Sequence, residues 1–311
     1  MYLGIDLGGT NIAVGLVDEK GAILAKDSTP TLSQRPYQEV VKDMADLCAK
    51  VAASDGYSMD QIKGIGIGSP GTVDAENGVI VYANNLDWHN VPLRAELQKY
   101  FSVPVQIEND ANAAAFGAYV MEGGQVDSFL MITLGTGIGG GIIIDKKIYR
   151  GFNGAGGELG HITLVHDGVP CTCGRRGCWE SYASVTALIR QTTEAIEAHP
   201  DSLMKQLADE KGEVSGRTAF EAAKKGDAAA QAVVDQYINY IADGVSSMIN
   251  IFQPKLFLIG GGISKEGDYL LNPIKQYVLD NTYCKEIPQT EIKIAAHQND
   301  AGIIGAAFAS K

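Results

Sequence analysis

Short apolar segments that alternate with polar residues open the chain. Tyr2–Leu7, Ile12–Val17 and Ala22–Ala25 are separated by the turn Gly8-Gly9-Thr10 and by the tight turn Asp18–Gly21. Alternation with a period of two predicts β-strands, and short turns rich in glycine or polar residues between such strands predict hairpins. The first 25 residues therefore predict a β-meander.

The same pattern returns in the middle of the chain. A shift of 127 positions lays Leu3, Ile5 and Gly8 on Leu130, Ile132 and Gly135. Glycine turns also follow the apolar strands within 65–71 and 256–262. The repeat predicts two related halves that hold a ligand where their glycine turns face each other. Chance similarity over so short a stretch is the alternative.

Between these strands the periodicity becomes helical. Apolar residues spaced by three and four predict helices at Tyr37–Ala53, Ala111–Met121, Thr186–His199, Asp227–Phe252 and Gly302–Ser310. Helices that alternate with strands define the α/β class.

Length and charge narrow the class of protein. The chain has 311 residues, 45% of them hydrophobic, which predicts about two domains, with a boundary near residue 115. The net charge of −12 opposes binding to nucleic acid. The uncharged run Ser128–Ile144 is too short to span a membrane and is interrupted by glycines. We expect no nucleic-acid or membrane partner and a cytoplasmic location.

The first glycine turn has the composition of a phosphate site. In Asp6–Asn11 the glycines let backbone N–H groups approach phosphate oxygens, Thr10 and Asn11 add polar contacts, and Asp6 can face Mg²⁺. An ordinary hairpin is the alternative. The second copy, Leu134–Gly137, favours two loops that bind one nucleoside triphosphate. No P-loop pattern occurs in the sequence.

One glycine pattern is misleading. Gly66-x-Gly68-x-x-Gly71 matches the dinucleotide fingerprint, but Pro70 interrupts it and no helical pattern follows before Val91. We reject a Rossmann site. The segment 69–72 is either a turn whose backbone faces a small ligand or a turn alone.

The triplet Glu108-Asn109-Asp110 ends a strand and begins the Ala-rich helix. A carboxylate near a helix N-terminus is kept anionic by the helix dipole and can accept the proton of an attacking hydroxyl. Asp110 is thus a candidate general base. An N-cap is the alternative, because Asp and Asn are preferred caps.

A histidine and three cysteines make the most specific pattern. His161 is followed by Cys171, Cys173 and Cys178. One imidazole and three thiolates complete a tetrahedral zinc shell, which leaves no position for a catalytic water and predicts a structural ion. Reduced surface thiols with an unrelated histidine are the alternative. Cys48 and Cys284 are predicted to be small buried hydrophobic residues.

Two glutamates flank this pattern. Glu158 and Glu180 can accept hydrogen bonds from the paired hydroxyls of a polyol, and His161 can offer its second ring nitrogen to the same ligand. Solvated surface glutamates are the alternative.

Together these segments resemble the ROK (repressor, open reading frame, kinase) family, over residues 2 to about 309. The resemblance is carried by Asp6-x-Gly8-Gly9-Thr10, Glu108-Asn109-Asp110, Gly135-Thr136-Gly137, Glu158-x-Gly160-His161 with the run Cys171–Glu180, and Gly260-Gly261-Gly262. Within the family the sequence is most similar to bacterial ATP-dependent glucokinases.

The resemblance implies a duplicated, actin-like ATPase fold of the ribonuclease H-like type, with two α/β domains around a cleft. We expect domains at 1–115 plus 299–311 and at 116–298, the second with the zinc loop. The resemblance implies that Asp110 is the catalytic base and that the sugar is bound by Gly71, Thr72, Asn84, Asn109, Asp110, Glu158, His161 and Glu180. It implies that ATP and Mg²⁺ are bound by Asp6, Gly8, Gly9, Thr10, Asn11, Thr136, Gly137, Gly261 and Gly262. It also implies a structural Zn²⁺ bound by His161, Cys171, Cys173 and Cys178.

The implied activity is transfer of a phosphoryl group from ATP to the 6-hydroxyl of glucose. A kinase for N-acetylmannosamine or another hexose, and a non-catalytic sugar sensor, are the alternatives. Sugar and ATP are the expected partners, in a homodimer or homotetramer. Repressors of the family carry an N-terminal helix-turn-helix before this core, and because the core pattern here begins at Tyr2 we expect no DNA-binding domain.

Overall fold

A computed structural model describes residues 1–296 and 300–311 of the chain. The chain folds into two compact units, which we describe separately. Unit 1 comprises residues 1–129, 141–157 and 296–311, and unit 2 comprises residues 130–140 and 158–295. The expected boundary near residue 115 differs from this division, because the helix that spans it packs within unit 1 over its whole length. The expected boundary between residues 298 and 299 lies outside the described residues.

The first sheet belongs to unit 1 and has the strand order β3-β2-β1-β4-β8. Strand β1 pairs antiparallel with β2 and parallel with β4. The predicted meander is confirmed, although its third strand is longer than expected. The strands are β1 (Tyr2–Leu7), β2 (Asn11–Val17), β3 (Ile23–Pro30), β4 (Gly64–Ser69) and β8 (Val105–Asn109).

The second sheet repeats this arrangement with the order β11-β10-β9-β12-β13. A meander again comes first, and two strands further along the chain complete the sheet. The predicted repeat of the meander is therefore confirmed, and it extends to a duplicated sheet topology. The strands are β9 (Ser128–Leu134), β10 (Ile138–Ile144), β11 (Lys147–Ile148), β12 (Leu256–Gly260) and β13 (Glu291–Ile294).

A small third sheet was not predicted from the sequence. Strands β5 (Thr72–Asp74), β6 (Val79–Ala83) and β7 (Trp88–Val91) pair antiparallel in unit 1. Strand β4 is thus followed by a strand and not by a helix. The rejection of a Rossmann site at Gly66–Gly71 is therefore correct, because no helix N-terminus follows those glycines.

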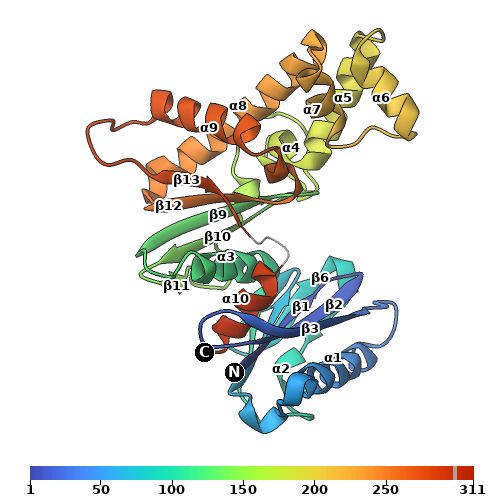
Figure 1. Ribbon diagram of the computed structural model, residues 1–311, viewed down its shortest axis with the longest axis vertical. Coiled ribbons are helices and arrows are strands. Elements are labelled where there is room, and N and C mark those ends of the chain that lie inside the picture. Colours follow the sequence, from blue (N-terminus) through green and yellow to red (C-terminus); the bar gives the residue numbers. More distant parts are fainter. Residues whose placement is uncertain (297–299) are drawn as a thin grey trace. The chain divides into compact units, whose positions relative to one another are not determined.

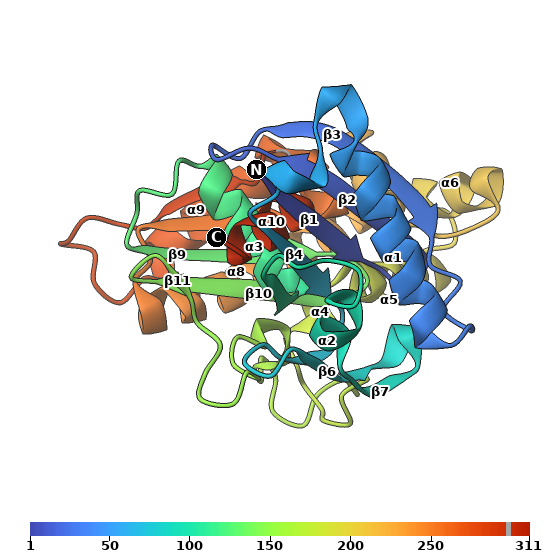
Figure 2. The same cartoon turned by 90° about the horizontal axis from the view of Figure 1, so that it is seen from below.

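Helices cover the first sheet in unit 1. Helix α1 (Tyr37–Ala52) packs on β2 and β3, while α10 (Ala301–Ala309) packs on β1, β4 and α3 (Asp110–Met121), as Figures 1 and 2 show. The short α2 (Leu93–Leu97) follows β7. Three of these helices were predicted to within two residues at each end, because their apolar stripes and flanking turns are local signals.

Glycines let α10 approach the sheet and α3 at backbone distance. A Cβ on Gly4 would lie 1.9 Å from the Ile303 oxygen, and one on Gly66 would lie 1.6 Å from the Ala306 oxygen. On the neighbouring helix, a Cβ on Gly117 would lie 1.9 Å from the Ala301 oxygen. The sequence had suggested ligands and sharp turns as the reason for its clustered glycines, but these three serve helix packing.

Helices make up most of unit 2. The longest, α8 (Ala228–Phe252), begins at the N-cap Asp227, as predicted, and packs on α5, α7 and α9 (Figure 1). None of the helices in the described chain combines the length and apolar character needed to cross a bilayer. The others in this unit are α4 (Glu180–Ala183), α5 (Val185–Ala198), α6 (Leu203–Lys211), α7 (Thr218–Lys224) and α9 (Asp268–Asn281).

Short 3-10 helices complete the described structure. They are η1 (Ser54–Gly56), η2 (Met59–Gln61), η3 (Asn84–Leu86), η4 (Leu159–His161) and η5 (Gly262–Glu266). The resemblance assigns Asn84, the first residue of η3, and His161, the last residue of η4, to the sugar site.

Candidate functional site

The histidine and the three cysteines form a metal-sized cluster in unit 2. The ligand atoms of His161, Cys171, Cys173 and Cys178 all lie within 4.8 Å of one another. Nδ1 of His161 is 3.6 Å from Sγ of Cys171, and the sulfurs of Cys173 and Cys178 are 3.7 Å apart. Tetrahedral bonds of about 2.3 Å to sulfur and about 2.0–2.1 Å to nitrogen put neighbouring ligand atoms about 3.6–3.8 Å apart. The cluster therefore fits Zn²⁺.

One of the four ligands, Cys178, is buried. Burial raises the pKa of the Cys178 thiol to about 12. A bound zinc ion stabilises the thiolate and offsets this cost. Because Nδ1 of His161 faces the sulfurs, Nε2 is the nitrogen that remains for a second partner.

The zinc loop is attached to the helical part of unit 2 by Trp179. This side chain is fully buried, and its Nε1 donates to the Tyr240 oxygen of α8 at 2.7 Å. A Cβ on Gly244 would lie 2.0 Å from the indole, so only glycine leaves room for it. Within the loop Gly174 and Gly177 have positive φ, as the predicted tight turns require. Helix α8 thus supports the loop that carries the metal ligands.

Glu180 joins the zinc cluster to the second glycine turn. Its Oε2 accepts a hydrogen bond from the Ile138 N–H at 2.9 Å, and its Oε1 lies 3.8 Å from Sγ of Cys171. A Cβ on Gly137 would lie 2.0 Å from Oε2. The carboxylate is therefore held in place by the backbone next to Thr136 and Gly137. Glu158, by contrast, is exposed and comes directly before η4, which contains His161.

The two glycine turns of unit 2 adjoin each other. A Cβ on Gly261, whose φ is +90°, would lie 2.2 Å from the Leu134 oxygen, so this residue packs on the end of β9. The Gly135 oxygen accepts a hydrogen bond from the Val185 N–H at 2.8 Å. Gly262 lines a cavity of about 640 Å³ together with Lys211 at the end of α6, with Ser215 and Arg217 of the loop after α6, and with residues of η5. Such a cavity is large enough for a nucleoside.

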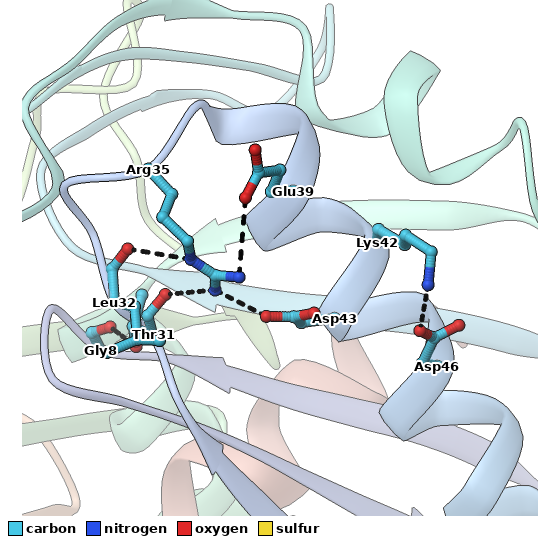
Figure 3. A network of polar contacts seen from close by, with 8 residues as sticks. All are labelled: Gly8, Thr31, Leu32, Arg35, Glu39, Lys42, Asp43 and Asp46. Carbon is cyan, nitrogen blue, oxygen red and sulfur yellow. Dashed lines mark hydrogen bonds and ion pairs between the residues drawn. The ribbon is translucent and has the colours of Figure 1, made fainter.

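The first glycine turn, in unit 1, is held by hydrogen bonds from Thr31. Thr31 donates its hydroxyl to the Gly8 oxygen at 2.6 Å, and its N–H donates to the Thr10 oxygen at 2.9 Å. Arg35 in turn binds the Thr31 oxygen at 3.0 Å and Asp43 of α1 at 2.6 Å (Figure 3). The turn is thereby fixed, while Thr10 and Asn11 remain exposed.

Asp6 lies one residue before the end of β1, beside this turn. Its carboxylate lies next to α10, where a Cβ on Gly302 would be 3.4 Å from Oδ2. Burial raises the pKa of the Asp6 carboxyl above its ordinary value. A divalent cation would offset this penalty, so the environment of Asp6 fits Mg²⁺.

The junction of β8 and α3 settles which residue caps the helix. The Oδ1 atom of Asn109 accepts hydrogen bonds from the Ala111 and Asn112 N–H groups at 2.9 and 3.2 Å, so Asn109 is the N-cap. Asp110 is the first residue of α3, and it is exposed. The capping alternative for Asp110 is therefore wrong, and its carboxylate lies in the favourable field of the helix N-terminus.

The remaining sugar-site candidates lie around this junction in unit 1. Nδ2 of Asn109 donates to the Gly71 oxygen at 3.1 Å, and Thr72 begins β5. A Cβ on Gly71, whose φ is +87°, would lie 2.1 Å from the Tyr82 oxygen, so glycine is required there. Asn84 begins η3 and lines a cavity of about 670 Å³ that also includes Trp88 and Tyr37.

The candidate residues thus fall into two sets. Unit 1 holds Asp6, Gly8, Gly9, Thr10, Asn11, Gly71, Thr72, Asn84, Asn109 and Asp110, and unit 2 holds Thr136, Gly137, Glu158, His161, Glu180, Gly261, Gly262 and the cysteine ligands. A Cβ on Gly9 would lie 2.9 Å from the Asn85 oxygen, which shows how the first turn and the Asn84 segment meet within unit 1.

Sequence reasoning missed several supporting residues. Thr31 and Arg150 are 23 and 42 residues from the Gly8 and Glu108 that they hold, and Arg35 acts through Thr31. Glu108 was quoted only as part of its triplet. Glu108 is 2% exposed, and its carboxylate accepts hydrogen bonds from Arg150 and Asn112. Its place beside Asn109 was the one available signal. Cys284 was also misjudged: it lies in the loop after α9 and is only half-buried, whereas Cys48 is buried as predicted.

Comparisons with known proteins give the family. The model of the ROK family matches residues 2–311. A glucokinase from Thermotoga maritima is 39% identical over 307 residues, which are 98% of this chain and 95% of that protein. A glucokinase from Halalkalibacterium halodurans is 37% identical over 312 residues, which are 100% of this chain and 94% of that protein.

A solved structure gives the same result. The crystal structure of a ROK family glucokinase from Streptomyces griseus in complex with glucose and AMPPNP matches with a TM-score of 0.80 and 37% identity, over 99% of this chain and 98% of that chain. The chain belongs to the ROK family. Its duplicated sheet order is that of the actin-like ATPase fold, as expected from the sequence.

Proposed function

We propose that this protein is an ATP-dependent glucokinase that transfers the γ-phosphoryl group of ATP to the 6-hydroxyl of glucose. The observation that carries the proposal is the match over nearly the whole chain to a glucokinase crystallised with glucose and AMPPNP. The exposed carboxylate of Asp110 at the start of α3 supplies the basic group that such a transfer uses.

Asp110 is the general base of the proposed reaction. Its carboxylate accepts the proton of the sugar 6-hydroxyl as that oxygen attacks the γ-phosphorus. The new O–P bond forms as the bond from the γ-phosphorus to the β,γ-bridging oxygen breaks, so the products are glucose 6-phosphate and ADP. In such transfers the protein mainly positions the reactants and stabilises charge.

The glycine turns hold the donor. Gly8, Gly9, Thr10 and Asn11, together with Thr136 and Gly137, offer backbone N–H and side-chain groups to the phosphates. Gly261 and Gly262 adjoin the adenosine, which the 640 Å³ cavity at Gly262 supports. Asp6 would hold Mg²⁺, which would supply positive charge to neutralise the phosphates of ATP.

The other hydroxyls of the sugar define its orientation. Asn109, Glu158, His161 and Glu180 bind them, with Gly71, Thr72 and Asn84 lining the same pocket. Zn²⁺ bound by His161, Cys171, Cys173 and Cys178 would have a structural role, because four protein ligands leave no open position. The fixed carboxylate of Glu180, bound to the Ile138 N–H, supports this assignment.

A coupled ATP-consumption assay tests the proposal. The purified protein is assayed with glucose, N-acetylmannosamine, mannose, allose, fructose and N-acetylglucosamine. We expect kcat/KM for glucose to exceed that for every other sugar by about tenfold or more, which is about 1.4 kcal/mol of transition-state binding. A preference for another sugar would indicate that the protein is a hexose kinase of different specificity. Absence of sugar-dependent turnover would contradict the proposal and favour a sugar sensor.

The proposal extends to the assembly. The family resemblance implies a homodimer or homotetramer. Sedimentation velocity, repeated with glucose present, measures which state forms, and a monomer at micromolar concentration would contradict this part of the proposal.

A further inference from the structure

A glycine-rich loop, residues 150–157, follows strand β11 in unit 1. Gly151, Gly154 and Gly157 have positive φ, and Phe152 is fully exposed. One backbone hydrogen bond, from the Gly156 N–H to the Arg150 oxygen at 2.8 Å, closes the loop. These glycines allow the backbone of a free loop many conformations. The loop therefore adopts one defined conformation only if its ends are attached to the rest of the unit.

Arg150 attaches the first end to a buried carboxylate. Its Nε donates to Oε2 of Glu108 at 2.7 Å, and a second guanidinium nitrogen forms an ion pair with the same oxygen. The Glu108 side chain is 3% exposed, whereas that of Arg150 is 39% exposed. A carboxylate this deeply buried is stable only when it is paired and hydrogen-bonded.

The second end of the loop, Gly157, lies beside Asn112, which binds the same carboxylate. Its Nδ2 donates to Oε1 of Glu108 at 3.1 Å, and a Cβ on Gly157 would lie 4.0 Å from its Oδ1. The two ends of the loop therefore lie beside Glu108 and Asn112, which are hydrogen-bonded to each other, although Glu108 and Arg150 are 42 residues apart in sequence. Gly157 is followed directly by Glu158, to which we assigned the binding of a sugar hydroxyl.

We propose that Arg150 is a positioning residue for the sugar, with Glu108 as its partner. The ion pair fixes loop 150–157 on the β8–α3 junction, and so fixes the point from which the chain continues to Glu158. The inference rests on the proposed function, because it assigns a role in sugar binding.

The geometry also predicts which kinetic constant depends on the pair. Asn109 keeps its own bonds when Arg150 is lost, because its cap bonds, its bond to the Gly71 oxygen and the bond from its N–H to Oε1 of Glu108 do not involve Arg150. In the described part of the chain, the first glycine turn that we assigned to ATP is held by Thr31 and not by Glu108 or Arg150. Loss of the pair should therefore weaken sugar binding, with much less effect on the base and on ATP.

The test compares Arg150→Met with Arg94→Met in the full-length protein. Arg94 is a matched control, because its guanidinium also bonds inside unit 1, to the Ala75, Glu76 and Val105 oxygens, but at the opposite end of β8. For Arg150→Met we expect the glucose KM to rise about tenfold or more, while kcat changes by less than about threefold and the ATP KM by less than about twofold. Arg94→Met should change none of the three constants beyond twofold or so.

Two further measurements separate positioning from general loss of structure. Guanidinium ion added at millimolar concentration should lower the glucose KM of Arg150→Ala towards the wild-type value and leave Arg94→Ala unchanged. Glu108→Gln should raise the glucose KM as Arg150→Met does, and the double variant should be no worse than the poorer single variant.

The outcomes are distinct. If wild-type protein consumes no ATP with any sugar, the proposed function fails, and this result is obtained before any variant is made. If wild-type protein is active and Arg150→Met has the glucose KM of Arg94→Met, the role of Arg150 is overturned. It is equally overturned if glucose KM, ATP KM and thermal stability change together, or if guanidinium restores nothing.

Discussion

Asp110 and Asn109 show how adjacent residues of similar chemistry take different roles. Asn109 caps α3 with Oδ1 and donates to the Gly71 oxygen with Nδ2, which leaves the second Nδ2 hydrogen for a sugar hydroxyl. Asp110, one position later, is exposed at the first turn of the helix. Asp110 is therefore not the cap, and its carboxylate, which accepts a hydrogen bond from the Ala111 N–H at 2.8 Å, lies in the favourable field of the helix N-terminus.

The first prediction concerns this carboxylate. Asp110→Asn removes the proton acceptor but keeps size and polarity, so kcat should fall by about 10²–10⁴, the usual contribution of a general base. The glucose KM should change by less than about threefold, because hydroxyl contacts elsewhere remain. The coupled ATP-consumption assay measures both constants.

The control for this variant is Asp46→Asn on the exposed face of α1, where Asp46 pairs with Lys42 in solvent. It should behave as the wild type. Turnover by Asp110→Asn within a few-fold of the wild-type rate would refute the assignment of Asp110 as the base.

At the scale of elements, helix N-termini in unit 2 share a single carboxylate. Asp227 accepts hydrogen bonds from the Ala230 N–H of α8 at 2.8 Å and from the Leu203 N–H of α6 at 2.7 Å. The Ser202 hydroxyl donates to the same side chain at 2.8 Å. The cap of α8 was predictable, whereas the link to α6, 24 residues earlier, was not.

The second prediction follows from this shared cap. Asp227→Ala should lower the free energy of unfolding by about 2 kcal/mol, the upper range for loss of one cap, because two helices lose an acceptor. Asp227→Asn should cost less, since asparagine also caps well. Urea unfolding measures the differences, and equal midpoints for Asp227→Ala and wild type would contradict the prediction.

The lowered pKa of Asp227 determines how the stability of the protein changes with pH. Burial opposes ionisation of Asp227, but the hydrogen bonds from Ala230, Leu203 and Ser202 outweigh it and hold its pKa below the ordinary value. A lowered pKa in the folded state stabilises the protein above the unfolded pKa of about 3.9 and loses this effect as the pH falls through the folded pKa. The advantage of wild type over Asp227→Asn should therefore shrink below about pH 4.

For the whole molecule, the zinc cluster matters most to unit 2. The loop that carries the ligands is attached to α8 by Trp179 and to the second glycine turn by Glu180. Removal of the ion would leave thiolates without their cation and a loop with little regular structure. Unit 1 contains none of these ligands.

The third prediction is that the protein binds about one zinc ion per chain by elemental analysis. A strong chelator should increase hydrogen exchange in residues 158–180 and in α8, and leave exchange in β1, β4 and α1 unchanged. Cys178→Ser should lose the metal, and Cys284→Ser, which changes a cysteine outside the cluster, should retain it. A fully active protein without zinc would contradict the structural role of the ion.

The sequence by itself determined the elements and the local chemistry. The meander strands, their repeat, the cap at Asp227 and the zinc ligands follow from short-range signals, because alternation, capping and metal spacing act over a few to about twenty residues. The family resemblance added the expected roles of Asp110, Glu158 and Glu180. The third sheet was missed because its strands are short, between 3 and 5 residues.

Only the tertiary structure decided which distant residues meet. Glu108 pairs with Arg150, and Glu180 accepts a hydrogen bond from the Ile138 N–H, each across 42 residues of sequence. No spacing in the sequence encodes such a pair. Gly4 and Gly66 carry no local turn, and their role becomes visible only when the backbone of α10 lies against them. The physical reason is that buried charges and close-packed backbones are satisfied by whichever partner the fold brings to them, wherever that partner lies in the chain.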